Sequence, residues 1–570
     1  MIFNRSGRTF LLGALAALAL LVTPAGARAQ SAHLGTVNFP TSGSPEAQHH
    51  FLRGVAALHS FWYEEALEEF QAATKVDPDF MMGYWGEAMT YNHPLWAQQD
   101  TEAGRKAVAR IKDSPKLTER ERGFLDAVRK LYGDGDKLAR DRAYSAAMEK
   151  LYNADPADQE VASFYSLSIL GTVRPGDNGF SRQNLAGRVA QGVFKKNPDH
   201  PGAAHYIIHA FDDPQHAIIA LVAARRYSEI APAAHHARHM PSHIFLQLGM
   251  WPEAASSNES AWAASDEWVK RKKLHVGKRD YHSLHWLLYV YLQQGRQKEA
   301  ERLLDVMRRS IAEAGGERQL GRPVMVDMAA IFIVETARWD LAETLFPAPA
   351  AGAAAPQEKV SPAGATAAAS HCAPGGAYAH DAPSSLPARG LVLTAYIKGL
   401  SAAMAGRPQV EGSVAELRSL RQRLAAGGDA YRAREAEIME TGVTAASAAA
   451  KGNYEEAVAL MRKAVALEEE MSPPSGPPDL IKPSHELLGE ILLRACRPEE
   501  AAREFKTALL RQPNRARSML GYARAARDMK SPEAARAYAS FWQVWSEADP
   551  QLAELREAVD YVEKVGAQQE

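Results

Sequence analysis

The chain has 570 residues, a formal net charge of -2 at pH 7 and 24% charged residues. Such a balance excludes the strongly basic field that binding to nucleic acid or to an anionic membrane would need, so we expect no nucleic-acid partner. The chain has only 2 cysteines, Cys372 and Cys496, which excludes a disulfide framework. One bridge between them and two free thiols both remain open.

The start of the chain is typical of a secretory signal peptide. Arg5 and Arg8 precede an apolar run from Phe10 to Val22, and Ala27 to Ala29 form a small-x-small cleavage site. We interpret residues 1–29 as a segment that is removed on export, which predicts a periplasmic or secreted mature protein. Contact with a membrane is expected only if this segment is retained as an anchor, for which the apolar run is short.

Two segments share the same spacing of small, aromatic and proline residues. The first set is Gly54, Ala66, Phe70, Ala73 and Pro78, and the second is Gly489, Ala501, Phe505, Ala508 and Pro513. These segments resemble the tetratricopeptide repeat, a helix-turn-helix unit of about 34 residues. Weaker copies place Ala254, Ala300 and Ala457 in the role of Ala66. The resemblance implies an all-α, right-handed superhelical array of antiparallel helix pairs, whose first helices line a concave groove that binds a protein or peptide.

One segment of unusual composition interrupts this array. The segment 347–388 is rich in Ala, Pro, Gly and Ser and has almost no large apolar side chains, so it cannot bury enough surface to offset its ordering entropy. We interpret it as a flexible low-complexity linker. The predicted organisation is an N-terminal extension at 30–46, an N-terminal array at 47–346 that includes His-rich repeats at 200–295, the linker, and a C-terminal array at 389–563.

Histidines recur in these repeats at fixed distances from the alanines of the second helices. Eleven of the 19 histidines lie between His200 and His285. The reference positions are Ala220, Ala254 and Ala300, and 15 residues before them lie His205, His239 and His285. Eleven residues before Ala220 and Ala254 lie His209 and His243. Eighteen residues before Ala254 and Ala300 lie His236 and His282. In the resembled family these positions face the groove. Adjacent helices lie about 8–10 Å apart, so several imidazoles can meet in one volume.

This pattern predicts a multi-histidine metal site. Neutral imidazole suits zinc, copper, iron and nickel, and outside the cytoplasm copper or zinc are the natural candidates. The site would be closed and structural, or it would keep a position open for water or oxygen chemistry. The candidate ligands are His205, His209, His239, His243, His282 and His285, with His236 and Asp212 as weaker candidates.

Other interpretations of the histidines remain open. They also suit a polar groove that binds a peptide by hydrogen bonds, or a pH-sensitive surface. His200 before Pro201 and His239 before Pro241 are placed to cap helices, and Pro241 weakens the expectation that His239 and His243 share a face. Two functions therefore stand: a scaffold that binds a protein, peptide or small ligand, and a redox or hydrolytic metalloenzyme. The chain lacks the Glu of a zincin motif, a CxxCH haem motif and a phosphate-binding loop.

A second group of residues suggests a pocket in the first repeats. Asn92, His93 and Trp96 lie close together in the sequence, and His59 precedes Phe61 and Trp62. Packing between helices explains these aromatic residues equally well, and is the interpretation that we favour.

Overall fold

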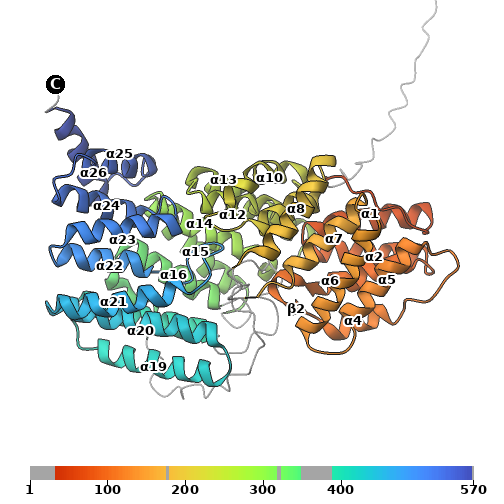
Figure 1. Ribbon diagram of the computed structural model, residues 1–570, viewed down its shortest axis with the longest axis horizontal. Coiled ribbons are helices and arrows are strands. Elements are labelled where there is room, and N and C mark those ends of the chain that lie inside the picture. Colours follow the sequence, from red (N-terminus) through yellow and green to blue (C-terminus); the bar gives the residue numbers. More distant parts are fainter. Residues whose placement is uncertain (1–32, 175–178, 317–321, 348–387, 568–570) are drawn as a thin grey trace, which may run out of the picture.

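The computed structural model describes residues 33–174, 179–316, 322–347 and 388–567. The described chain is a succession of helices in which each one packs against its neighbours in the sequence (Figure 1). This confirms the predicted all-α array of helix pairs. The predicted signal peptide, residues 348–387 of the predicted linker, and Cys372 lie outside the described residues. Cys496 is exposed and is a free thiol.

The helices of the N-terminal array carry all the candidate histidine ligands. They are α1 (Pro45–His59), α2 (Tyr63–Val76), α3 (Met81–Thr90), α4 (Thr101–Val108), α5 (Glu119–Leu131), α6 (Lys137–Ala154), α7 (Gln159–Leu170), α8 (Ser181–Lys196), α9 (Pro201–Ala210), α10 (Ala217–Ile230), α11 (His235–His239), α12 (Pro241–Gln247), α13 (Trp251–Lys272), α14 (Tyr281–Gln293), α15 (Gln297–Glu313), α16 (Arg322–Thr336) and α17 (Ala342–Leu345), with the 3-10 turns η2 (Val276–Lys278) and η3 (Trp339–Leu341).

The C-terminal array continues the same pattern. Its helices are α18 (Ala388–Met404), α19 (Val410–Ala426), α20 (Ala430–Ala450), α21 (Tyr454–Glu469), α22 (Ser484–Arg494), α23 (Pro498–Arg511), α24 (Ala516–Asp528), α25 (Ala534–Val544) and α26 (Ala553–Gly566). Among the described residues, strands are limited to β1 (Asn92–His93) and β2 (Gln98–Gln99), which pair antiparallel around the turn η1 (Pro94–Trp96). Within the described ranges, no helix combines the length and the apolar character needed to cross a bilayer.

The glycines of the repeat signature explain how the helices approach each other. A Cβ added to Gly54 on α1 would lie 2.7 Å from the ring of Phe70 on α2, and one added to Gly86 on α3 would lie 2.2 Å from it. Phe70 therefore fills a space that only glycine leaves. Phe505 repeats this arrangement, because a Cβ on Gly489 would lie 2.8 Å from its ring. These contacts confirm the structural role that the two matching spacings predict.

The two arrays share a core. One continuous set of buried apolar side chains runs from Leu34 to Ala525 and includes residues of both arrays. At its centre the guanidinium of Arg515, which is fully buried, pairs with Glu335 of α16 at 2.7 Å and with Glu486 of α22 at 2.8 Å. Arg515 also donates to the hydroxyl of Tyr289 on α14. These contacts join the last helices of the N-terminal array to the C-terminal one.

Candidate metal centre

Six histidines form two groups, in each of which one nitrogen per ring lies within 4.8 Å of the others. The first group, called here the His205 triad, is His205, His209 and His236. The second, the His239 triad, is His239, His243 and His282. Helix α9 supplies two members of the first triad, α11 supplies one member to each, and α12 and α14 supply the remaining two. Either triad could hold a metal ion.

Helices α11 and α12 are nearly continuous, which brings His239 and His243 together in spite of Pro241. Met240, between the two helices, has right-handed helical angles, and Pro241 occupies the first turn of α12, where its missing N–H costs nothing. His239 makes no capping hydrogen bond to α12. It lies one turn before His243, with 3.1 Å between their Nε2 atoms. The alternative role of His239 as a cap is therefore wrong.

The Nε2 atoms converge in both triads. In the His205 triad, Nε2 of His205 lies 3.0 Å from Nε2 of His209 and 3.2 Å from Nε2 of His236. In the His239 triad, Nε2 of His239 lies 3.1 Å from Nε2 of His243 and 2.9 Å from Nε2 of His282. Two ligands about 2.0 Å from one tetrahedral ion lie about 3.3 Å apart, so these separations are close to those of ligands on a common metal.

The opposite ring nitrogens of three histidines donate to oxygen atoms. Nδ1 of His205 donates to the carbonyl oxygen of His59 at 2.7 Å, Nδ1 of His239 to Oδ1 of Asn258 at 2.7 Å, and Nδ1 of His243 to Oδ2 of Asp212 at 2.6 Å. The amide of Asn258 is oriented by its own Nδ2, which donates to the carbonyl of Ala254. An oxygen acceptor requires the proton on Nδ1, so each neutral ring presents the lone pair of Nε2 to its triad.

When both rings are neutral, this assignment leaves no proton between Nε2 of His239 and Nε2 of His243. Both rings donate through Nδ1, so in their neutral forms two lone pairs face each other at 3.1 Å. Two acceptors at this distance repel each other, whereas a cation between them satisfies both. Orientation of each ligand through its second nitrogen is the usual arrangement of metal-binding histidines.

Burial favours the neutral form of four of the six imidazoles. Burial, reinforced by the neighbouring imidazoles, lowers the pKa of His205 and of His239 to about 3. Burial also holds the pKa of His209 and of His236 well below the ordinary value, again reinforced by the other rings. Neutral imidazole is the form that binds metal, so these four rings are ready to act as ligands without first losing a proton.

Aromatic side chains enclose the two triads. Phe61 packs against His205, with ring centroids 4.3 Å apart, and also against His209 and His236. Trp286 packs against His243, with centroids 4.2 Å apart. Five of the six histidines are buried, and only His209 is half-buried. Among the six histidines, His209 is therefore the one nearest to solvent.

The remaining candidates have other positions. His285 is buried on α14, one turn after His282, and within the described part of the chain it belongs to no group of three. Asp212 is outside both triads but orients His243. His236, the weaker candidate, completes the His205 triad. Its position 18 residues before Ala254 matches that of His282 before Ala300, so the repeat spacing already contained the signal.

A third group contains a carboxylate, Glu160, which no sequence pattern indicated. His59, Glu160 and His200 are completely buried and close enough to hold an ion. However, Nδ1 of His200 accepts the N–H of Ala203 as the cap of α9, so its Nε2 donates to Glu160. His59 donates to Glu160 through Nε2 and contacts the hydroxyl of Tyr206 through Nδ1. The group is a satisfied network that joins α1, α7 and α9, and its predicted member His200 has the expected capping role.

The two histidines determine the protonation state of the Glu160 carboxyl. Burial alone would raise the pKa of the Glu160 carboxyl, but His200 and His59 together hold it well below its ordinary value. The carboxylate is therefore ionised and accepts hydrogen bonds from both rings.

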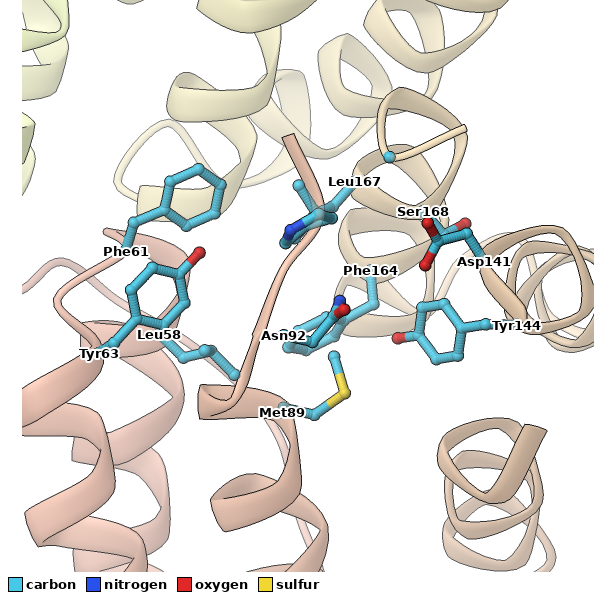
Figure 2. A pocket seen from close by; sticks show the side chains of 12 residues that line it. Leu58, Phe61, Tyr63, Met89, Asn92, Asp141, Tyr144, Phe164, Leu167 and Ser168 are labelled. Atoms are coloured by element: carbon cyan, nitrogen blue, oxygen red, sulfur yellow. The ribbon is translucent and has the colours of Figure 1, made fainter. Parts of the chain in front are cut away.

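The pocket suggested by the aromatic residues of the first repeats is small. A cavity of about 20 Å³ lies between α1, α3, α6 and α7, with Phe61, Tyr63, Asn92 and Tyr144 among its lining side chains (Figure 2). This is room for about one water molecule. Trp96 is fully buried and packs against Phe61. The aromatic residues therefore act mainly in packing, as we favoured from the sequence.

Comparisons with known proteins do not place this chain in a family. No family model matches the chain, and no curated protein matches it. Among solved structures, yeast Tom70 aligns over 92% of this chain and 89% of its own, with 11% identity and a TM-score of 0.22. Human IFIT1, solved as a dimer with m7Gppp-AAAA, aligns over 93% of this chain and 91% of its own, with 12% identity and a TM-score of 0.29. Likeness at this level says nothing about what this chain binds.

Proposed function

We propose that this protein is an exported helical-repeat scaffold that holds copper or zinc in the His205 and His239 triads. The observation that carries the proposal is the orientation of the rings. Three of them donate through Nδ1 to oxygen atoms, and their Nε2 atoms lie 2.9–3.2 Å from Nε2 of other rings in the triads. Export rests on the signal-peptide pattern of residues 1–29.

The ligand set favours copper and zinc over harder metals. Each triad offers three neutral imidazoles and no carboxylate, whereas magnesium, calcium and manganese prefer oxygen ligands. Among first-row divalent ions, copper binds nitrogen sites most strongly, and more strongly than zinc.

The rest of the array supplies a surface for a partner. Helix pairs of this kind form an extended face, and we include a protein, peptide or small ligand bound there in the proposed function. A metalloenzyme is the second candidate, because three protein ligands leave the fourth position of a tetrahedral ion for water or substrate, as in catalytic zinc sites. The half-buried edge at His209 would give access to that position.

Metal analysis of untagged protein tests the proposal. After purification and dialysis, elemental analysis should find close to two equivalents of copper or zinc per chain. His205→Ala and His239→Ala should each remove about one equivalent. His275→Asn is the matched control, because His275 is an exposed histidine of the same segment and asparagine retains its capping role at η2. If only traces of metal were found after incubation with either ion, metal binding would be refuted. A scaffold without a metal would then be the remaining function.

A further inference from the structure

The nearest rings of the two triads are closer to each other than the most distant rings within each triad. The ring centroids of His209 and His243, from different triads, are 5.8 Å apart, and those of His236 and His239 are 6.0 Å apart. Within the triads, the centroids of His209 and His236 are 6.5 Å apart, and those of His243 and His282 are 6.4 Å apart. The six rings therefore form one continuous cluster.

Helix α11 places the two sites at a defined spacing. His236 and His239 are three residues apart on this helix, and each belongs to a different triad. A helix rises about 1.5 Å per residue, so the two ligands are offset by about 4.5 Å along its axis. Pairs of metal ions that share a ligand are separated by about 3.5–4 Å. The geometry of α11 is therefore suited to two ions that share a bridging ligand.

We propose that the His205 and His239 triads form one dinuclear copper centre that binds dioxygen between its two ions. This inference rests on the proposed function and specifies its metal and its ligand. Neither triad includes a carboxylate or a thiolate, so the ligands themselves contribute no negative charge.

The charge around the site favours Cu(I). Asp212 accepts from His243, and the buried Asp280 accepts from His235, the residue before His236. Two Cu(I) ions carry two positive charges, which these two carboxylates balance. Two Zn(II) ions would carry four, and uncompensated charge inside a protein is costly.

The reaction with dioxygen needs nothing beyond the two ions. Each Cu(I) gives one electron, so both become Cu(II), and dioxygen takes up the two electrons to become a bridging peroxide. The oxygen-oxygen bond is retained, two copper-oxygen interactions form, and no proton is transferred. The walls formed by Phe61 and Trp286 are apolar and aromatic, which suits a small neutral ligand.

Oxygen uptake and electron paramagnetic resonance test the inference. Untagged protein is loaded with Cu(I) without air, its copper is counted, and it is then exposed to dioxygen. We expect two copper ions per chain, uptake of one dioxygen for each pair, and a Cu(II) spin count far below the total copper, because bridged Cu(II) ions couple to a diamagnetic pair. His282→Ala should bind one copper and lose dioxygen uptake, and its copper should remain Cu(I) without a spin signal until a chemical oxidant is added, after which the Cu(II) signal should account for all of it. His275→Asn should behave as the unchanged chain.

The outcomes separate this inference from the proposed function. Two copper ions with a full spin count, or without dioxygen uptake, would mean independent sites, so the dinuclear centre would be wrong and the metal-binding scaffold would stand. Binding of zinc but not of Cu(I) would also overturn the inference alone. Failure to bind either metal would overturn both. Dioxygen uptake and the spin count of the unchanged chain, taken together, decide the question even if His282→Ala does not fold.

Discussion

Nδ1 of His243 lies 2.6 Å from Oδ2 of Asp212, a residue that comes directly after the helix carrying His205 and His209. The segment that supplies two ligands of one triad therefore orients a ligand of the other. Gln247 reinforces this contact by donating to Oδ1 of Asp212.

Asp212→Asn should weaken metal binding without unfolding the protein. The amide can still accept from His243, but it has lost the negative charge that strengthens the imidazole as a ligand. Loss of such a partner typically reduces metal affinity about 10- to 100-fold. Competition with a chelator measures the change. Asp213→Asn is the matched control, because its side chain contacts His216 instead. An equal effect of both variants would mean that Asp212 has no special role.

Gly476→Ala should loosen the cover over the His239 triad. A Cβ at Gly476 would lie 2.5 Å from the ring of Trp286, which packs on His243. Either the segment around Gly476 or the indole must then move. We expect a destabilisation of about 1–3 kcal/mol and faster loss of metal to a chelator.

Denaturant titration and stopped-flow chelation measure these two effects. Gly412→Ala provides the control, because nothing lies within 4 Å of its added Cβ and the residue is inside α19. That variant should be neutral or slightly stabilised. Unchanged metal release in Gly476→Ala would show that this contact does not cover the site.

Arg515→Ala should destabilise the whole protein. It would remove the buried ion pairs of Arg515 with Glu335 and Glu486, of which Glu486 keeps only Lys482 as a cationic partner, and loss of a partner from a buried pair costs about 3–5 kcal/mol. Arg462→Ala, which removes an exposed pair with Glu500, should cost less than about 1 kcal/mol. Urea denaturation followed by circular dichroism compares the two. Similar midpoints for both variants would mean that the Arg515 network does not hold the arrays together.

His93 should make the metal-free protein sensitive to mild acid. Burial lowers the pKa of His93 to about 4 in the folded state, whereas in the unfolded chain it is near 6.5. Between these values only the unfolded chain binds the proton, so this contribution to stability is complete above pH 6.5 and is lost as the pH falls toward 4.

His93→Phe should remove this sensitivity and keep the stacking on Tyr63, whose ring centroid lies 4.0 Å from that of His93. In the presence of a chelator, the loss of unfolding free energy between pH 7 and pH 4.5 should shrink by roughly 2 kcal/mol. Urea titrations at the two pH values measure it. A loss as large as that of the unchanged chain would contradict the assignment.

Because repeats place equivalent residues in equivalent positions, the sequence predicted that histidines of neighbouring first helices meet, but not that they form two triads. The offsets of 15, 11 and 18 residues mark the inner face of each first helix, so histidines at these offsets converge. The pattern could not distinguish His282 from His285, which lie one turn apart on α14, because that choice depends on how α14 is rotated against α11. It also ranked His236 below His285, although His236 belongs to a triad and His285 does not.

The residues that orient the ligands could not be predicted. Asn258 lies on the second helix of its pair, and the carbonyl of His59 belongs to a helix that is distant in the sequence. Their contacts arise from packing between helices and have no periodic signal. Glu160 was missed for the same reason, since nothing near it in the sequence indicates its histidine partners.

Anomalous diffraction from crystals of copper-loaded protein tests the central claim most directly. Data collected on both sides of the copper edge locate the ions without reference to any assumed ligand. We predict two peaks per chain, one about 2 Å from Nε2 of His205, His209 and His236, and the other about 2 Å from Nε2 of His239, His243 and His282. Absence of density between these rings, with copper only at surface histidines such as His49 or His275, would contradict the account.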